Sequence, residues 1–123
     1  MTDATMLHRQ MNPSWIQNNR VTSQAFKPTP KDEGLLSVYD GDQITADKAW
    51  VHFTTTLGFQ SVGSLAVTVQ ECRQNELPVE PKPEQFPEHV VINFTAFGGN
   101  QIEKKAKKLR AAAEARGWQY QAL

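Results

Sequence analysis

The sequence predicts an α+β domain in which a mixed or mostly antiparallel sheet packs in two layers with two main helices. Two segments, at about 45–57 and 101–116, carry apolar residues at helical spacing. Short runs rich in Val, Ile and Leu lie around them and are separated by turn residues. A chain of 123 residues has the length of one domain, so we expect residues 1–123 to fold as a single unit.

The first predicted helix covers about 45–57. Thr45 is a favoured N-cap residue, and Asp47 in the first turn interacts well with the helix dipole. The residues that share its apolar face are Ala46, Ala49, Trp50, Phe53 and Leu57. Gly58 follows directly, as is typical of a helix end. The pattern indicates an amphipathic helix of about three turns.

The second predicted helix covers about 101–116. Asn100 and Glu103 have the spacing of an N-terminal capping pair, and Gly117 is a suitable stop. The apolar stripe consists of Ile102, Ala106, Leu109 and Ala113. Lys104, Lys107 and Lys108 fall on the opposite face at 100° per residue. The last 23 residues contain six of the thirteen basic residues of a formally neutral chain, so this helix predicts a local basic surface.

The predicted strands are the segments 6–10, 21–26, 35–39, 65–70, 90–94 and 118–120. Between the two predicted helices, residues 71–88 contain four prolines among several glutamates. Proline disfavours both a helix and the hydrogen bonding of a β-sheet. We therefore predict an extended loop over 71–88. Phe86 is its one apolar anchor, which can hold the loop against the domain or against a partner.

Composition excludes several classes of protein. A single cysteine, Cys72, rules out an internal disulfide, and His8, His52 and His89 do not have metal-ligand spacing. The acidic pairs near residues 32–42 are explained as turn residues, so we expect neither a metal site nor a cofactor. The chain has no apolar run of membrane-spanning length and no leader-like beginning. We expect a cytoplasmic protein without a membrane segment.

The leading functional hypothesis is a small interaction or regulatory module that acts through protein contacts. Two segments have the composition of contact surfaces, namely the lysine face and the loop rich in Pro and Glu. Their candidate residues are Lys104, Lys107, Lys108, Glu80, Glu84 and Phe86. A nucleic-acid-associated protein using the same lysines is an alternative. No aromatic side chain lies among these lysines to stack on bases, which favours a protein partner.

An enzyme is the other alternative. Arg9 and Arg20 lie near hydroxyl and amide side chains and are candidates for binding an anion, because guanidinium pairs bidentately with oxyanions. The order Arg9, Ser23, Glu71 is similar to that of the ADP-ribosyltransferases, with an early basic residue, a strand bearing Ser or Thr, and a later glutamate. The resemblance implies an enzyme that uses NAD, with these three residues as its catalytic set.

Overall fold

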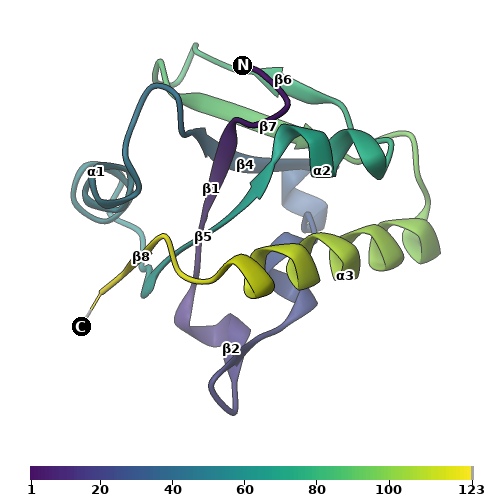
Figure 1. Ribbon diagram of the computed structural model, residues 1–123, viewed down its shortest axis with the longest axis horizontal. Helices are drawn as coiled ribbons and strands as arrows, with labels where there is room; N and C mark the ends of the chain where they lie inside the picture. The colour runs from purple at the N-terminus through teal and green to yellow at the C-terminus, as the bar shows by residue number, and fades with distance from the viewer. Residues whose placement is uncertain (123) are drawn as a thin grey trace.

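The computed structural model describes residues 1–122 and forms an α+β domain whose main core lies between two layers, a sheet and a long helix. Its main sheet has six strands in the order β6-β7-β4-β1-β5-β8, and every pairing among the described residues is antiparallel. The strands are β1 (Met6–Gln10), β4 (Leu35–Asp40), β5 (Gly63–Thr68), β6 (Val79–Pro81), β7 (His89–Asn93) and β8 (Tyr120–Gln121). The predicted fold class is confirmed (Figure 1).

The sheet opens between its two central strands. β1 pairs with β5 along its whole length, from Met6 with Thr68 to Gln10 with Ser64. By contrast, β1 pairs with β4 only through Leu7 with Asp40 and His8 with Tyr39. Beyond these two pairs the strands separate, although β4 continues to pair with β7 as far as its start. A gap therefore lies between β1 and the first half of β4.

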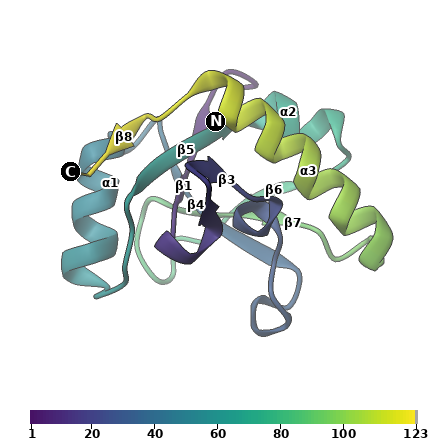
Figure 2. The same ribbon diagram turned by 90° about the horizontal axis from the view of Figure 1, so that it is seen from below.

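The main core lies between the sheet and α3 (Gly99–Arg116). Side chains alternate across a strand, so Leu7, Leu36 and Val38 point to this layer. The helix contributes Ala106, Leu109 and Ala113, which are fully buried. Small residues at two of these positions let the helix approach the strands closely. Figure 2 shows α3 crossing the sheet, with α2 alongside it.

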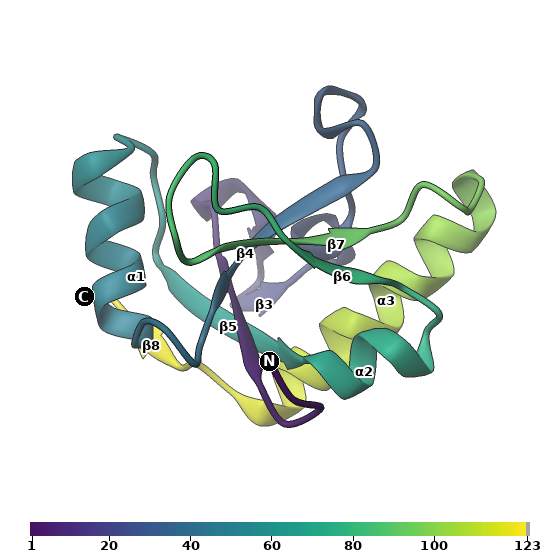
Figure 3. The same cartoon turned by 90° about the horizontal axis from the view of Figure 1, so that it is seen from above.

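The helix predicted over about 45–57 is present and packs on the opposite face of the sheet. It consists of α1 (Ala46–Val51) and a π-helical turn, η4 (His52–Thr56). Trp50 Nε1 donates to the carbonyl of Ser61 at 2.9 Å. The hydroxyl of Tyr39, on β4, is hydrogen-bonded to His52. Figure 3 shows strands between α1 and α3. A π-turn widens a helix locally and is frequent at functional sites.

The predicted strand over 21–26 is shorter than expected. The segment 21–26 contains only the second residue of β3 (Arg20–Val21), which pairs with β2 (Ile16–Gln17), and continues as a 3-10 helix, η2 (Ser23–Phe26). Its Ala25 and Phe26 are fully buried. Two further 3-10 turns, η1 (Pro13–Trp15) and η3 (Pro30–Asp32), complete this half of the chain. Tertiary burial of a short helical turn therefore replaces the expected ladder.

The segment predicted as an extended loop over 71–88 begins as a helix, α2 (Val69–Gln74). The hydroxyl of Thr68 accepts from the backbone N–H of Glu71 at 3.1 Å, and Glu71 Oε1 accepts from the backbone N–H of Thr68 at 2.8 Å. This reciprocal capping box ends β5 and starts the helix. Further on, β6 is an edge strand, where Pro81 is tolerated because an edge residue has a free side.

The start of α3 also differs from the prediction. The N-cap is Gly98, and Asn100 lies inside the helix instead of capping it. Glu103 forms an ion pair with Lys27 at 2.7 Å, so its side chain serves a tertiary contact. Across residues 1–122, none of the helices has the length and apolar content that crossing a bilayer requires.

Candidate functional site

The gap between β1 and β4 opens into a cleft. Three adjoining cavities of about 110, 360 and 600 Å³ lie there, and within residues 1–122 Ser37 is the one side chain that lines all three. Their walls come from β1, β4, the start of β7, the η4 segment and the loop before β7. We call this region the Ser37 cleft. The polar side chains of its 110 Å³ cavity include Arg9, Gln10, Ser37 and His89. The 360 Å³ cavity adds the charged side chains of Asp32, Lys82 and Glu84.

Arg9 occupies the gap in the sheet. Its Nε donates to the carbonyl of Ala25 at 2.8 Å and its Nη1 to the carbonyl of Ser37 at 2.9 Å, so the side chain replaces the strand pairing that β4 lacks here. The guanidinium lies 4.9 Å from the ring of Trp15. Burial lowers the pKa of Arg9 to about 10, and the charge of Asp32 only partly opposes this shift. Within the described chain, Arg9 forms no ion pair.

Gln10 presents an unused donor beside Arg9. Its Oε1 accepts from the hydroxyl of Ser61 at 2.9 Å, which fixes the orientation of the amide. The residue is only 4% exposed, and its Nε2 has no hydrogen-bond partner among residues 1–122. A buried N–H without a partner is uncommon, because it has lost its hydration without compensation. Gln10 lines the two cavities that Arg9 also lines.

Ser37 and His89 form a hydrogen-bonded pair on the floor of the cleft. His89 Nε2 lies 3.0 Å from Ser37 Oγ, and His89 Nδ1 lies 3.1 Å from the carbonyl oxygen of Lys82. A carbonyl can only accept, so Nδ1 carries the proton and Nε2 accepts from the serine hydroxyl. Burial lowers the pKa of His89, which favours this neutral form. The arrangement holds a solvent-exposed hydroxyl against a base.

An aromatic cluster closes one wall of the cleft. Phe86 packs against Tyr39, His52 and His89, with ring centroids 5.2, 4.6 and 4.9 Å away. The hydroxyl of Tyr39 lies 2.8 Å from His52 Nδ1, and burial raises the pKa of Tyr39. The structure thus places Phe86, the apolar anchor recognised in the sequence, against the domain itself. Glu84, from the same loop, lines the 360 Å³ cavity.

Two exposed apolar side chains stand at the mouth of the cleft. Leu57 is 38% exposed and Phe59 is 59% exposed, and both line the 110 Å³ cavity. Phe59 also packs on Phe53, with ring centroids 5.2 Å apart. We call Leu57 and Phe59 the apolar rim. Val51, on the same helical segment, is 51% exposed.

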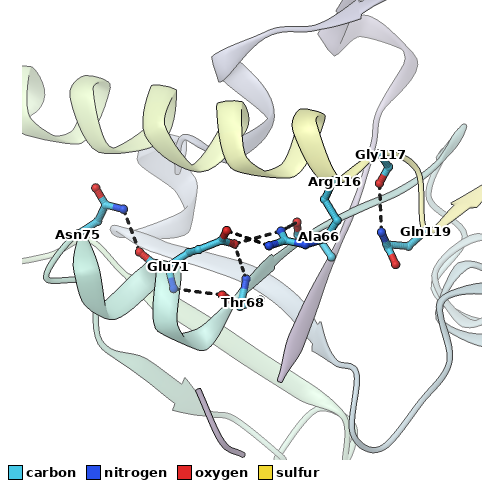
Figure 4. A network of polar contacts seen from close by, with 7 residues as sticks. All are labelled: Ala66, Thr68, Glu71, Asn75, Arg116, Gly117 and Gln119. Atoms are coloured by element: carbon cyan, nitrogen blue, oxygen red, sulfur yellow. Dashed lines mark hydrogen bonds and ion pairs between the residues drawn. The ribbon is translucent and has the colours of Figure 1, made fainter. Parts of the chain in front are cut away.

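The three residues proposed from the ADP-ribosyltransferase resemblance lie in different surroundings. Arg9 lies in the Ser37 cleft, whereas Ser23 lines a separate cavity with Trp15. Glu71 lies on α2 and is bound by Arg116, with contacts of 2.8 and 3.0 Å (Figure 4). None of the five main cavities of the described chain is lined by all three.

The roles of Glu71 and Arg20 are explained by local structure. Burial acts to raise the pKa of Glu71, but hydrogen bonds from Arg116 and Thr68 outweigh it and keep that pKa below its ordinary value. Arg20, the second anion-binding candidate, pairs with Glu114 at 2.7 Å. Its guanidinium therefore already has a carboxylate, in contrast to that of Arg9.

The predicted contact residues outside the cleft are spread over two elements. Lys104, Lys107 and Lys108 are exposed on α3, and in the described chain none of them lines the three cavities of the cleft. Glu80 lies on the edge strand β6 and accepts from Asn93 Nδ2 at 3.3 Å. The lysines and the cleft are therefore separate surfaces.

Sequence reasoning missed Gln10, Ser37 and His89. Gln10 ends the predicted strand 6–10, Ser37 lies inside the predicted strand 35–39, and His89 directly precedes the predicted strand 90–94. A polar residue within or next to an apolar strand is the signal that marks them. Nothing local relates Ser37 to His89, because their contact depends on the β4–β7 register. Within residues 1–122, no group of three or more His, Cys, Asp or Glu side chains is placed to hold a metal ion.

Comparisons with protein-family models, with curated proteins and with solved structures found no match. Fold and site together define a small α+β domain with a cleft that combines an unpaired cation, a serine–histidine pair and an apolar mouth.

Proposed function

We propose that this chain is an interaction domain that binds a partner protein through the apolar rim and the Ser37 cleft. The observation that carries the proposal is the location of exposed apolar side chains. The described chain has four large exposed apolar residues, and Val51, Leu57 and Phe59 all belong to the α1–η4 segment and its continuation. Exposed apolar groups gathered beside a cavity are typical of a binding surface.

The physical basis is the burial of the apolar rim. Covering apolar surface contributes about 25 cal/mol per Å², and aromatic side chains near a pocket supply a large share of the binding energy in protein interfaces. Arg9 lies beside the rim and adds charge recognition. The lysine face of α3 is a second surface, which we expect to speed association with an acidic partner more than to stabilise the complex.

The proposal includes a cytoplasmic location. Cys72 is a free cysteine and is fully buried, and burial raises the pKa of its thiol to about 12. A thiol in this state reacts slowly with oxidants and suits a reducing compartment.

Affinity capture from nuclease-treated lysate tests the proposal. The wild-type chain is compared with a variant carrying Leu57→Ser and Phe59→Ser, and with a control carrying Lys104→Glu and Lys108→Glu. We expect a stoichiometric protein partner that the rim variant loses by about tenfold and the lysine variant retains. Capture that is unaffected by the rim changes would overturn the proposal. Loss on nuclease treatment together with loss in the lysine variant would instead support nucleic-acid binding.

A second candidate function rests on the Ser37–His89 pair, whose geometry is that of a nucleophile and its base. Ser37 Oγ would attack the carbonyl carbon of an ester while His89 Nε2 takes the hydroxyl proton and passes it to the departing alcohol. Water would then hydrolyse the acyl-serine and release the acid. A fluorophosphonate probe tests this candidate, with labelling expected on Ser37 and abolished by Ser37→Ala and by His89→Gln. Absence of labelling on the folded wild-type chain would overturn it.

A further inference from the structure

We infer that the Ser37 cleft binds a carboxylate carried on an apolar group, with Arg9 and Gln10 as its hydrogen-bond donors. The inference names the chemical group that the partner presents and rests on the proposed function for the identity of that partner.

The first step is the charge of Arg9. Two of its three nitrogens donate to neutral backbone carbonyls, and no hydrogen bond from Nη2 is formed within residues 1–122. The other arginines form ion pairs with carboxylates, as Arg20 does with Glu114 and Arg116 with Glu71. The charge of Asp32 acts on Arg9 without a direct ion pair, so an anionic ligand at Nη2 would supply the charged hydrogen bond that Arg9 lacks among the described residues.

The second step is the amide of Gln10. Its orientation is fixed by the bond from Ser61, and its Nε2 is buried without a partner within the described chain. Gln10 and Arg9 line the same two cavities, of about 110 and 600 Å³. Two unused donors that share cavities favour a ligand with more than one acceptor atom. A carboxylate offers two oxygens and pairs well with a guanidinium edge.

The third step favours a monoanion over a dianion. Ser37 donates its hydroxyl proton to His89, so it offers the ligand no further donor. Asp32 lines both the 600 Å³ cavity that Arg9 lines and the adjoining 360 Å³ cavity, which Glu84 and Lys82 also line. Because the carboxylate of Asp32 repels a dianion more strongly than a monoanion, a ligand with a single negative charge fits best beside Arg9 and Gln10.

The fourth step concerns the rest of the ligand. The 110 Å³ cavity is lined on its other sides by Val38, Tyr39, Phe53, Leu57, Phe59 and Phe86. Such a lining binds an aromatic or aliphatic group, and a few polar groups fix its orientation. The partner is thus expected to present an apolar side chain next to a carboxylate, either that of an acidic residue or that of a chain terminus.

NMR titration with small probes tests the inference without the partner. Benzoate, its uncharged analogue benzamide and inorganic phosphate are added to the ¹⁵N-labelled chain, and the side-chain signals of Arg9 Nε–H and Gln10 Nε2 are followed. We expect saturable shifts of both signals with benzoate, and at least about tenfold weaker binding of benzamide and of phosphate. Benzamide or phosphate binding as well as benzoate would overturn the inference, as would benzoate shifts confined to other residues.

Two variants sharpen this test. Gln10→Glu keeps the size of the side chain but places a negative charge beside the site, so benzoate binding should fall by about tenfold or more. Lys104→Glu makes the same kind of charge change on α3 and should leave binding unaltered. If Gln10→Glu disturbs the fold, the wild-type comparison of benzoate with benzamide still decides. Rim-dependent capture of a protein partner without benzoate binding would leave the proposed function standing and this inference overturned.

Discussion

Ser37 Oγ lies 3.0 Å from His89 Nε2, although the two residues are 52 positions apart in the chain. The contact exists because β4 and β7 pair in a register that places Tyr39 opposite His89, with Ser37 two residues along the same face. The carbonyl of Lys82 fixes the imidazole from the other side. The floor of the cleft is therefore set by strand register, and changes to that pairing should alter site and stability together.

Stability should decrease as the pH falls below the ordinary histidine value of 6.5. Burial lowers the pKa of His89, and burial also lowers that of His8. Between its folded and unfolded pKa values such a group binds more protons when unfolded, so its contribution to stability is present above pH 6.5 and is lost as the pH falls through the folded pKa. Melting temperatures measured between pH 7.5 and 5.5 should show this decline.

The matched variant for this titration is His89→Gln, which removes one of the two groups. We expect a flatter dependence of melting temperature on pH than in the wild-type chain. An unchanged slope would show that His89 has the same proton affinity in the folded and unfolded states.

Thr68→Ala should destabilise the fold by about 1 kcal/mol, because it removes one half of the capping box that starts α2. Glu71→Ala should cost more, since it also removes the ion pair with Arg116. Urea denaturation measures both free energies of unfolding. Equal stability of the Glu71→Ala variant and the wild-type chain would contradict the structural role assigned to this glutamate.

Leu109→Ala should lower the free energy of unfolding by about 2–5 kcal/mol, because Leu109 is fully buried between α3 and the sheet. Lys108→Ala, at the adjacent exposed position, should change it by less than about 0.5 kcal/mol. Chemical denaturation of the two variants compares them directly. Similar effects at both positions would show that α3 faces the sheet differently.

Gly63→Ala should destabilise the chain by about 1–3 kcal/mol and loosen β8. A Cβ at this position would lie 2.4 Å from the carbonyl oxygen of Tyr120, and the residue has a positive φ of 148°. Gly99→Ala is the matched control, since a Cβ there meets no atom within 4 Å and alanine favours the helix. Thermal unfolding should move in opposite directions for the two variants.

Periodicity predicted the main elements of this fold because their apolar spacing matches their final burial. α3 and β7 are examples, with α3 burying Leu109 and Ala113 as the helical stripe requires. The capping box of Thr68 and Glu71 was readable in the sequence, yet the strong alternation before it led to a strand prediction through residue 70. A local capping signal prevailed over the strand pattern there.

The candidate site was much less predictable. Arg9 and Phe86 were recognised as unusual residues, but their meeting at one cleft depends on the divergence of β1 and β4. The unpaired state of Arg9 and Gln10 is a property of their surroundings, as is the pairing of Arg20 with Glu114. Arg9 and Arg20 were equal candidates for anion binding in the sequence, but within the described residues only Arg20 has an ion-pair partner in the structure.

The central claim is that a partner protein binds at the apolar rim. A photo-crosslinking residue placed at Phe59, and in a separate variant at the exposed Ala111 of α3, tests it most directly in cells that contain the natural partner. We expect a discrete protein adduct from position 59 and little or none from position 111. Equal crosslinking from both positions, or an adduct from position 111 alone, would contradict it.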